Sequence, residues 1–89
     1  MRYADVGEKS RILLEANVNG YQICYRRVKS VNELVINGRV YDEKRGIIEF
    51  AHKLCATVDQ HTVEAGYDEE SYSYILFDGE LIKRKKRWI

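Results

Sequence analysis

Short runs of alternating apolar and polar residues fill most of this chain, and turn-forming dipeptides separate them. Asn-Gly occurs at residues 19–20 and 37–38, and Asp-Gly at 78–79, each between apolar or β-branched residues. Both dipeptides favour the type I′ turn, because its two central residues need a positive φ. Asp-Gln at 59–60 holds a similar place without the glycine. The pattern predicts four consecutive antiparallel hairpins, about eight strands, within residues 10–89.

The first and third hairpins are expected to have one apolar and one polar face, as half-buried antiparallel strands do. A two-residue turn fixes the register, so the cross-strand pairs follow from the sequence. In the first hairpin they are Leu14 with Tyr25, Ala16 with Ile23 and Val18 with Tyr21, then Glu15 with Cys24 and Asn17 with Gln22 on the polar face. In the third they are Leu54 with Ala65, Ala56 with Val63 and Val58 with His61, then Cys55 with Glu64 and Thr57 with Thr62 on the polar face.

The second and fourth hairpins carry apolar residues on both faces. The expected pairs are Val35 with Val40 and Leu34 with Tyr41 in the second, and Ile75 with Ile82 and Leu76 with Leu81 in the fourth. Strands that are apolar on both sides are typical of central positions in a sheet, or of a surface that a partner covers.

Residues 47–58 admit two interpretations. An alternating pattern typical of a strand is formed by Ile48, Phe50, His52, Leu54, Ala56 and Val58. One side of a helix would carry Ile47, Ala51, Leu54, Cys55 and Val58. We favour the strand, because a hairpin turn follows at 59–60 and because Gly46 disfavours a helix.

The two halves of the chain resemble each other. Residues 16–19 match residues 56–59 forty positions later, and residues 36–40 match residues 77–81 forty-one positions later. The near-constant offset indicates an internal duplication, although similar hairpins alone can produce the same match. The expected fold class is all-β, with four consecutive hairpins forming a small β-sandwich or barrel, and two similar halves if the duplication is real.

Length and charge narrow the class of protein further. The 89 residues correspond to one domain, and the net charge of +1 gives no strong field for steering a polyanion. Residues 1–9 lack the alternation and are expected to be a flexible N-terminal segment before a single domain at 10–89. A cytoplasmic location is expected, because no run approaches the ~20 apolar residues of a membrane helix and the first residues lack a signal-peptide core.

The residues best suited to catalysis or metal binding are His52, His61, Cys24 and Cys55. In the expected register both histidines lie on the apolar face and both cysteines on the opposite face, which disfavours a Cys–His dyad or a zinc site within a hairpin. Both thiols are expected to be free. We therefore predict no enzyme, no cofactor and no metal site, with a small enzyme or metal protein that uses His52, His61 and a cysteine as an alternative.

The C-terminal residues 83–88 are the most unusual segment, with five consecutive cations before Trp88. The register expected for the last hairpin places Tyr74 opposite Lys83 and Tyr72 opposite Lys85, all on one face. Aromatic rings interleaved with cations are what single-stranded nucleic-acid binders use. Lysines on a terminal edge strand also prevent edge-to-edge aggregation, which is the structural interpretation of the same pattern.

The sequence therefore predicts a small non-catalytic binding or protein-interaction module, with single-stranded nucleic-acid or other polyanion binding as the alternative. The candidate binding residues are Tyr72, Tyr74, Lys83, Lys85, Arg87 and Trp88. The expected partner is a protein or a second copy of the chain. Seven tyrosines and one tryptophan are more aromatic surface than so small a core encloses, so some are expected at an interface.

Overall fold

The computed structural model describes residues 2–3, 11–45 and 53–86. They form nine strands and no helix, which confirms the all-β prediction. The strands are β1 (Arg2–Tyr3), β2 (Arg11–Val18), β3 (Tyr21–Val28), β4 (Val31–Ile36), β5 (Arg39–Arg45), β6 (Lys53–Val58), β7 (His61–Tyr67), β8 (Tyr72–Phe77) and β9 (Glu80–Lys86). No helix in these ranges is long and apolar enough to cross a membrane.

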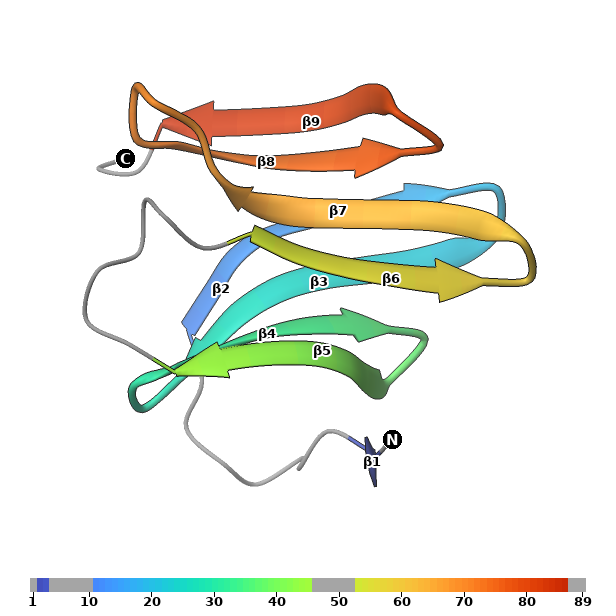
Figure 1. The fold of residues 1–89 in the computed structure, drawn as a ribbon, viewed down its shortest axis with the longest axis horizontal. Helices are drawn as coiled ribbons and strands as arrows, with labels where there is room; N and C mark the ends of the chain where they lie inside the picture. Colours follow the sequence, from blue (N-terminus) through green and yellow to red (C-terminus); the bar gives the residue numbers. More distant parts are fainter. Residues whose placement is uncertain (1, 4–10, 46–52, 87–89) are drawn as a thin grey trace.

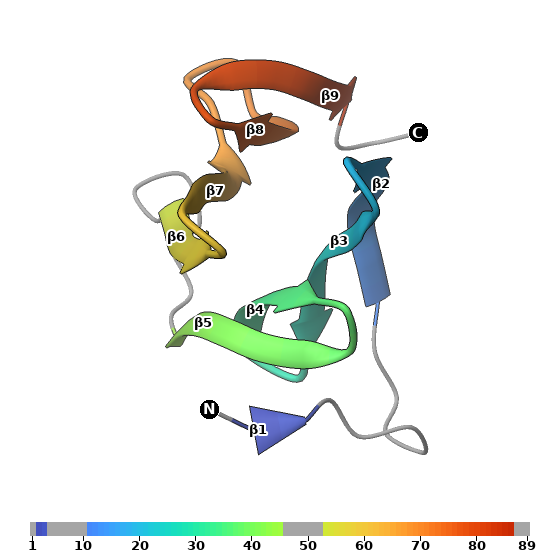
Figure 2. The same ribbon diagram turned by 90° about the vertical axis from the view of Figure 1, so that its right-hand side faces the viewer.

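Two antiparallel sheets make up the molecule (Figure 1). The strand orders are β1-β5-β4-β3-β2 and β6-β7-β8-β9. The sheets face each other and do not close into a barrel (Figure 2). Of the two folds that the sequence predicts, sandwich and barrel, the structure is therefore sandwich-like. The strands β2–β5 form one four-stranded unit and β6–β9 form the other. The first strand of each unit packs against the last two strands of the other: β2 against β8 and β9, and β6 against β4 and β5.

The four predicted turns are all present. Asn19, Asn37 and Asp78 have φ values of 50°, 50° and 51°, and the glycines that follow them have φ values near 80°. The third turn is formed by Asp59 and Gln60, at φ values of 48° and 68°. Gln60 therefore adopts the left-handed conformation that glycine supplies in the other three turns, at some cost in backbone strain.

Every cross-strand pair predicted for the first and third hairpins is confirmed. In the second and fourth, the pairs Val35–Val40 and Leu76–Leu81 are confirmed, but a β-bulge shifts the predicted pairs beyond them by one residue. Leu34 pairs with Asp42 instead of Tyr41, and Ile75 pairs with Lys83 instead of Ile82. The extra residue of each bulge, Tyr41 or Ile82, packs against the core.

The internal repeat extends from sequence to structure. The two bulges occur at positions forty-one residues apart, and the turn residues Asn37 and Asp78 make the same contact. The Asn37 side-chain oxygen accepts the Gln22 amide at 2.9 Å, and an Asp78 carboxylate oxygen accepts the Thr62 amide at 2.9 Å. The units β2–β5 and β6–β9 are thus equivalent in register, bulge and turn chemistry.

The core lies between the two sheets, on the faces that the alternation predicts. Its buried members are Leu14, Ile23, Tyr25, Leu34, Ile36, Leu54, Val63, Ala65, Tyr67, Ile75 and Phe77. The equivalent residues Leu14 and Leu54, on the first strand of each unit, are 3% and 1% exposed. Both units therefore contribute to one shared core.

Side chains from the two bulges link the sheets at the open corners of the sandwich. The Lys83 ammonium on β9 donates to the Glu15 carbonyl on β2 at 2.9 Å. At the equivalent corner, an Asp42 carboxylate oxygen on β5 accepts the Cys55 amide on β6 at 2.9 Å. A side chain at each bulge thus makes a hydrogen bond to a main-chain group on the edge strand of the other sheet. Such a bond makes that edge less able to pair with another chain.

Part of the outer face of the first sheet, around β4, is also buried. Val31, Val35 and Val40 are 8%, 6% and 5% exposed there. Beside them, Arg26 and Glu33 form a buried ion pair, with 2.7 Å between a guanidinium nitrogen and a carboxylate oxygen. β4 is therefore buried on both faces, as its two-sided apolar pattern predicts.

Several sequence-based predictions fall on residues outside the described ranges. They concern residues 47–52, which include His52 and for which strand and helix are the two interpretations, and the candidate binding residues Arg87 and Trp88. The later part of that ambiguous segment, Lys53–Val58, is a strand. Of the N-terminal segment, Arg2–Tyr3 pairs with β5 as β1.

Candidate functional site

The predicted tyrosine–lysine surface is divided between two faces of the last hairpin. The bulge at Ile82 shifts the later part of β9 by one residue, so Tyr72 pairs with Lys86 and Tyr74 with Arg84. Side chains alternate along a strand, so Lys83 and Lys85 lie on the opposite face from the two tyrosines. The prediction that Tyr72, Tyr74, Lys83 and Lys85 share a face is therefore wrong.

Arg84 occupies the place beside the tyrosines, and its charge is already paired. The guanidinium lies 4.0 Å from the centre of the Tyr72 ring. Its Nε donates to Asp68 at 2.7 Å and an Nη to Glu70 at 3.2 Å. The acidic loop before β8 thus neutralises this cation, and the guanidinium covers the Tyr72 ring on one side.

Tyr74, next along the same face, is also engaged. Its hydroxyl donates to a Glu64 carboxylate oxygen at 2.7 Å. Partial burial, followed by that hydrogen bond to Glu64, raises the pKa of Tyr74 well above its ordinary value. On the outer face of the second sheet, the Arg84 guanidinium and the Tyr74 hydroxyl are therefore both bound to carboxylates.

Asp68 organises the loop and should make stability depend on pH. Its hydrogen bond with Arg84, followed by bonds from the backbone amides of Tyr72 and Glu70, lowers the Asp68 pKa. A lowered pKa favours the folded state above the unfolded value of about 4, and this contribution disappears as the pH falls through the folded value. Denaturant unfolding should show Asp68→Asn less stable than wild type at pH 7, with the difference closing near pH 2.

The matched control for this prediction is Glu69→Gln in the same exposed loop. It removes the same charge without removing the contact to Arg84, so it should follow the wild-type pH profile. A stability difference for Asp68→Asn that is constant from pH 7 to about pH 2 would contradict the assigned role of the carboxylate.

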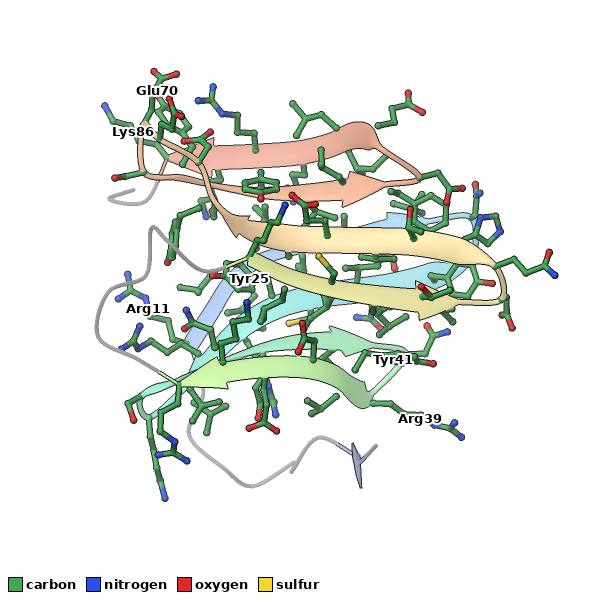
Figure 3. All side chains as sticks on the ribbon, viewed as in Figure 1. Arg11, Tyr25, Arg39, Tyr41, Glu70 and Lys86 are labelled. Atoms are coloured by element: carbon green, nitrogen blue, oxygen red, sulfur yellow. The ribbon has the colours of Figure 1, made fainter. Side chains whose placement is uncertain are left out.

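Lys85 and Lys86 line a depression at one end of the sandwich, where the start of β2 meets the end of β9. The lining residues are Arg11, Ile12, Leu13, Tyr67, Ser73, Lys85 and Lys86. Figure 3 shows Arg11 and Lys86 at the same end of the molecule, on strands from the two different sheets. We call this depression, with Arg11, Ser73, Lys85 and Lys86 as its polar residues, the cationic corner.

Buried residues form the floor of the cationic corner. Ser73 is 2% exposed, and its hydroxyl donates to the Lys85 carbonyl at 3.2 Å. Tyr67 is 7% exposed, and its ring meets that of Tyr25 edge-on with 5.8 Å between centroids. The floor is therefore held by packing and by one hydrogen bond to β9, which keeps Lys85 at the rim.

The cations at the rim differ in their pairing from three other cations of the molecule. Arg26, Lys53 and Arg84 each lie within 4 Å of a carboxylate. Arg11, Lys85 and Lys86 make no ion pair with any other described residue, and none of the described residues that line the corner is acidic. Three unpaired cations around a polar depression can attract and hold an anionic group.

The histidine and cysteine residues that the structure describes have ordinary structural surroundings. His61 packs on Phe77, with 5.0 Å between ring centroids, and its Nδ1 lies 2.7 Å from Asp78. Cys24 and Cys55 are free thiols, and burial raises the pKa of Cys24. The described part of the chain contains no group of three or more His, Cys, Asp or Glu residues placed to hold a metal ion.

No family model matches this chain, and neither the curated proteins nor the solved structures contain a significant match. The residues of the cationic corner therefore carry the functional argument. Sequence reasoning singled out Lys85 of this group and missed Arg11, Ser73 and Lys86.

Proposed function

We propose that this chain is a small non-catalytic protein-interaction module, and that its cationic corner binds an acidic segment of a partner protein. The observation that carries the proposal is the convergence of Arg11, Lys85 and Lys86 around one depression, without carboxylate partners among the described residues. A carboxylate placed there would accept charge-assisted hydrogen bonds from both sheets. The site would thus recognise side chains of glutamate or aspartate.

Two features favour an acidic protein segment over single-stranded nucleic acid. Binders of single strands combine a cationic groove with aromatic rings that stack on the bases. In the described residues, the rings nearest the corner are unsuited to stacking, because Tyr67 is buried and Tyr72 is covered by Arg84. The net charge of +1 also gives little long-range attraction for a polyanion.

The test is a titration with a fluorescein-labelled hexaglutamate peptide, followed by fluorescence anisotropy. We expect binding with a Kd on the order of 100 μM at low salt, weakening as salt is added. Changing Arg11→Glu and Lys85→Glu together should weaken binding by about tenfold or more, because two charge-assisted contacts become repulsive. A labelled hexaglutamine peptide is the neutral control and should not bind.

Lys53→Glu, on the exposed edge strand β6, is the control variant. It makes the same kind of charge change at a cation that does not line the corner, so hexaglutamate affinity should change by less than about twofold. Equal losses for Lys53→Glu and Lys85→Glu would show that only net charge matters and would refute the site. Tighter binding of an oligothymidylate than of hexaglutamate, with the same dependence on Arg11 and Lys85, would favour the nucleic-acid alternative instead.

A further inference from the structure

The equivalent units of the sandwich differ at one surface, the start of β9. Val35 and Val40 on the outer face of the first sheet are 6% and 5% exposed. Their equivalents forty-one residues later are Leu76, which is half-buried, and Leu81, which is 54% exposed. A large apolar side chain therefore lies open at a position that the other unit buries.

The two units also differ at the sheet edge beside these residues, which is paired with a further strand in one unit and is open in the described part of the other. In a hairpin closed by a two-residue turn, the residues next to the turn bond to each other, so the amide and carbonyl of the following residue point outward. In the second hairpin that residue is Val40, and Arg2 of β1 pairs with it. In the fourth it is Leu81, which pairs with Leu76 and with no second strand in the described part of the chain.

We infer that the edge of β9 at Glu80–Leu81 pairs with the same edge of a second copy of this chain, antiparallel and about a two-fold axis. The position of β1 on β5 shows, within the molecule, that this kind of edge accepts an added strand (Figure 2). Pairing centred on Leu81 brings the Leu76 and Leu81 side chains of both copies together on one face. It removes from water the apolar surface that a single copy exposes.

The charges along β9 favour a second copy as the occupant and fix its direction. The strand begins with Glu80, two residues after Asp78, and it ends with the four cations of residues 83–86. Antiparallel pairing centred on Leu81 places Glu80 of each copy opposite Ile82 of the other, next to Lys83. Parallel pairing would place like charges opposite each other, which destabilises a sheet.

The expected dimer is weak. Only the short stretch of β9 before the bulge has an open edge, because Lys83 beyond it already binds the Glu15 carbonyl on β2. Interfaces that bury less than ~1,200 Å² belong to transient complexes. We therefore expect a dissociation constant on the order of 0.1–1 mM.

Sedimentation equilibrium of the full chain, at concentrations up to about 1 mM, tests this dimer. The wild type should change from monomer to dimer over that range, and Leu81→Asp should remain monomeric. The matched control is Ile12→Asp, because Ile12 is the other large apolar side chain exposed by 54%. This variant should associate as the wild type does.

Amide hydrogen exchange gives a second readout that is independent of the variants. The Leu81 amide should exchange more slowly in concentrated than in dilute wild-type protein, because pairing converts an outward N–H into a hydrogen-bonded one. A wild type that stays monomeric over the whole range would overturn the proposal, and so would association that survives Leu81→Asp but is lost in Ile12→Asp. Because Leu81 lies outside the cationic corner, Leu81→Asp should still bind hexaglutamate, which separates this inference from the proposed function.

Discussion

Replacing Glu33 with alanine should lower the free energy of unfolding by about 3–5 kcal/mol, a large part of the stability of so small a domain. The carboxylate side chain is 3% exposed and that of its partner Arg26 is 10% exposed. Removing Glu33 leaves the Arg26 guanidinium buried without its counter-charge, and the cost of that desolvation far exceeds the value of a surface ion pair. Equilibrium unfolding in urea measures the loss directly.

The control for this effect is the double variant Arg26→Leu with Glu33→Leu. Two apolar side chains of similar bulk remove both charges together, so the double variant should recover most of the lost stability. A single variant Glu33→Ala that costs less than about 1 kcal/mol would show that the pair behaves like an exposed one.

Leu14→Ala and Leu54→Ala should each cost about 3 kcal/mol and should do so to a similar extent. The two leucines occupy equivalent positions on the first strands of the two units, and both lie in the shared core. Each truncation leaves a cavity between the sheets that neither sheet can close alone. Unfolding followed both by far-ultraviolet circular dichroism and by tyrosine fluorescence measures the loss.

Both probes should report one coincident transition in wild type and in both variants, because neither unit has a core of its own. Thr57→Ala, on the exposed outer face of β6, is the control and should change stability by less than about 0.5 kcal/mol. Two separated transitions, or a loss confined to the half that carries the substitution, would contradict the single shared core.

The hairpins differ in how well the sequence predicts them, and the difference has a physical cause. In the first and third, every pair follows from the turn, because one face is clearly apolar and one clearly polar. In the second and fourth, an apolar residue at either register satisfies the pattern, so the bulges at Tyr41 and Ile82 leave no trace in the alternation. The repeat was the available clue, since both bulges occur at matching positions.

The same shift of one residue explains the error at the candidate site. Because of this shift, Arg84 and Lys86 lie beside the tyrosines in place of Lys83 and Lys85. Asp68 and Glu70 of the acidic loop bind Arg84 there. The sequence does not predict that Arg11 belongs to the site, for another reason. It lies seventy-four residues from Lys85 in the chain, and only the packing of β2 against β9 brings the two cations to one corner.

The most direct test of the proposed function is a map of amide chemical-shift changes while unlabelled hexaglutamate is added to isotope-labelled protein. The account predicts that the largest changes fall at the cationic corner, on the amides of Arg11, Ser73 and Lys85. Changes that instead centre on Tyr72 and Tyr74, with the corner unaffected, would contradict it.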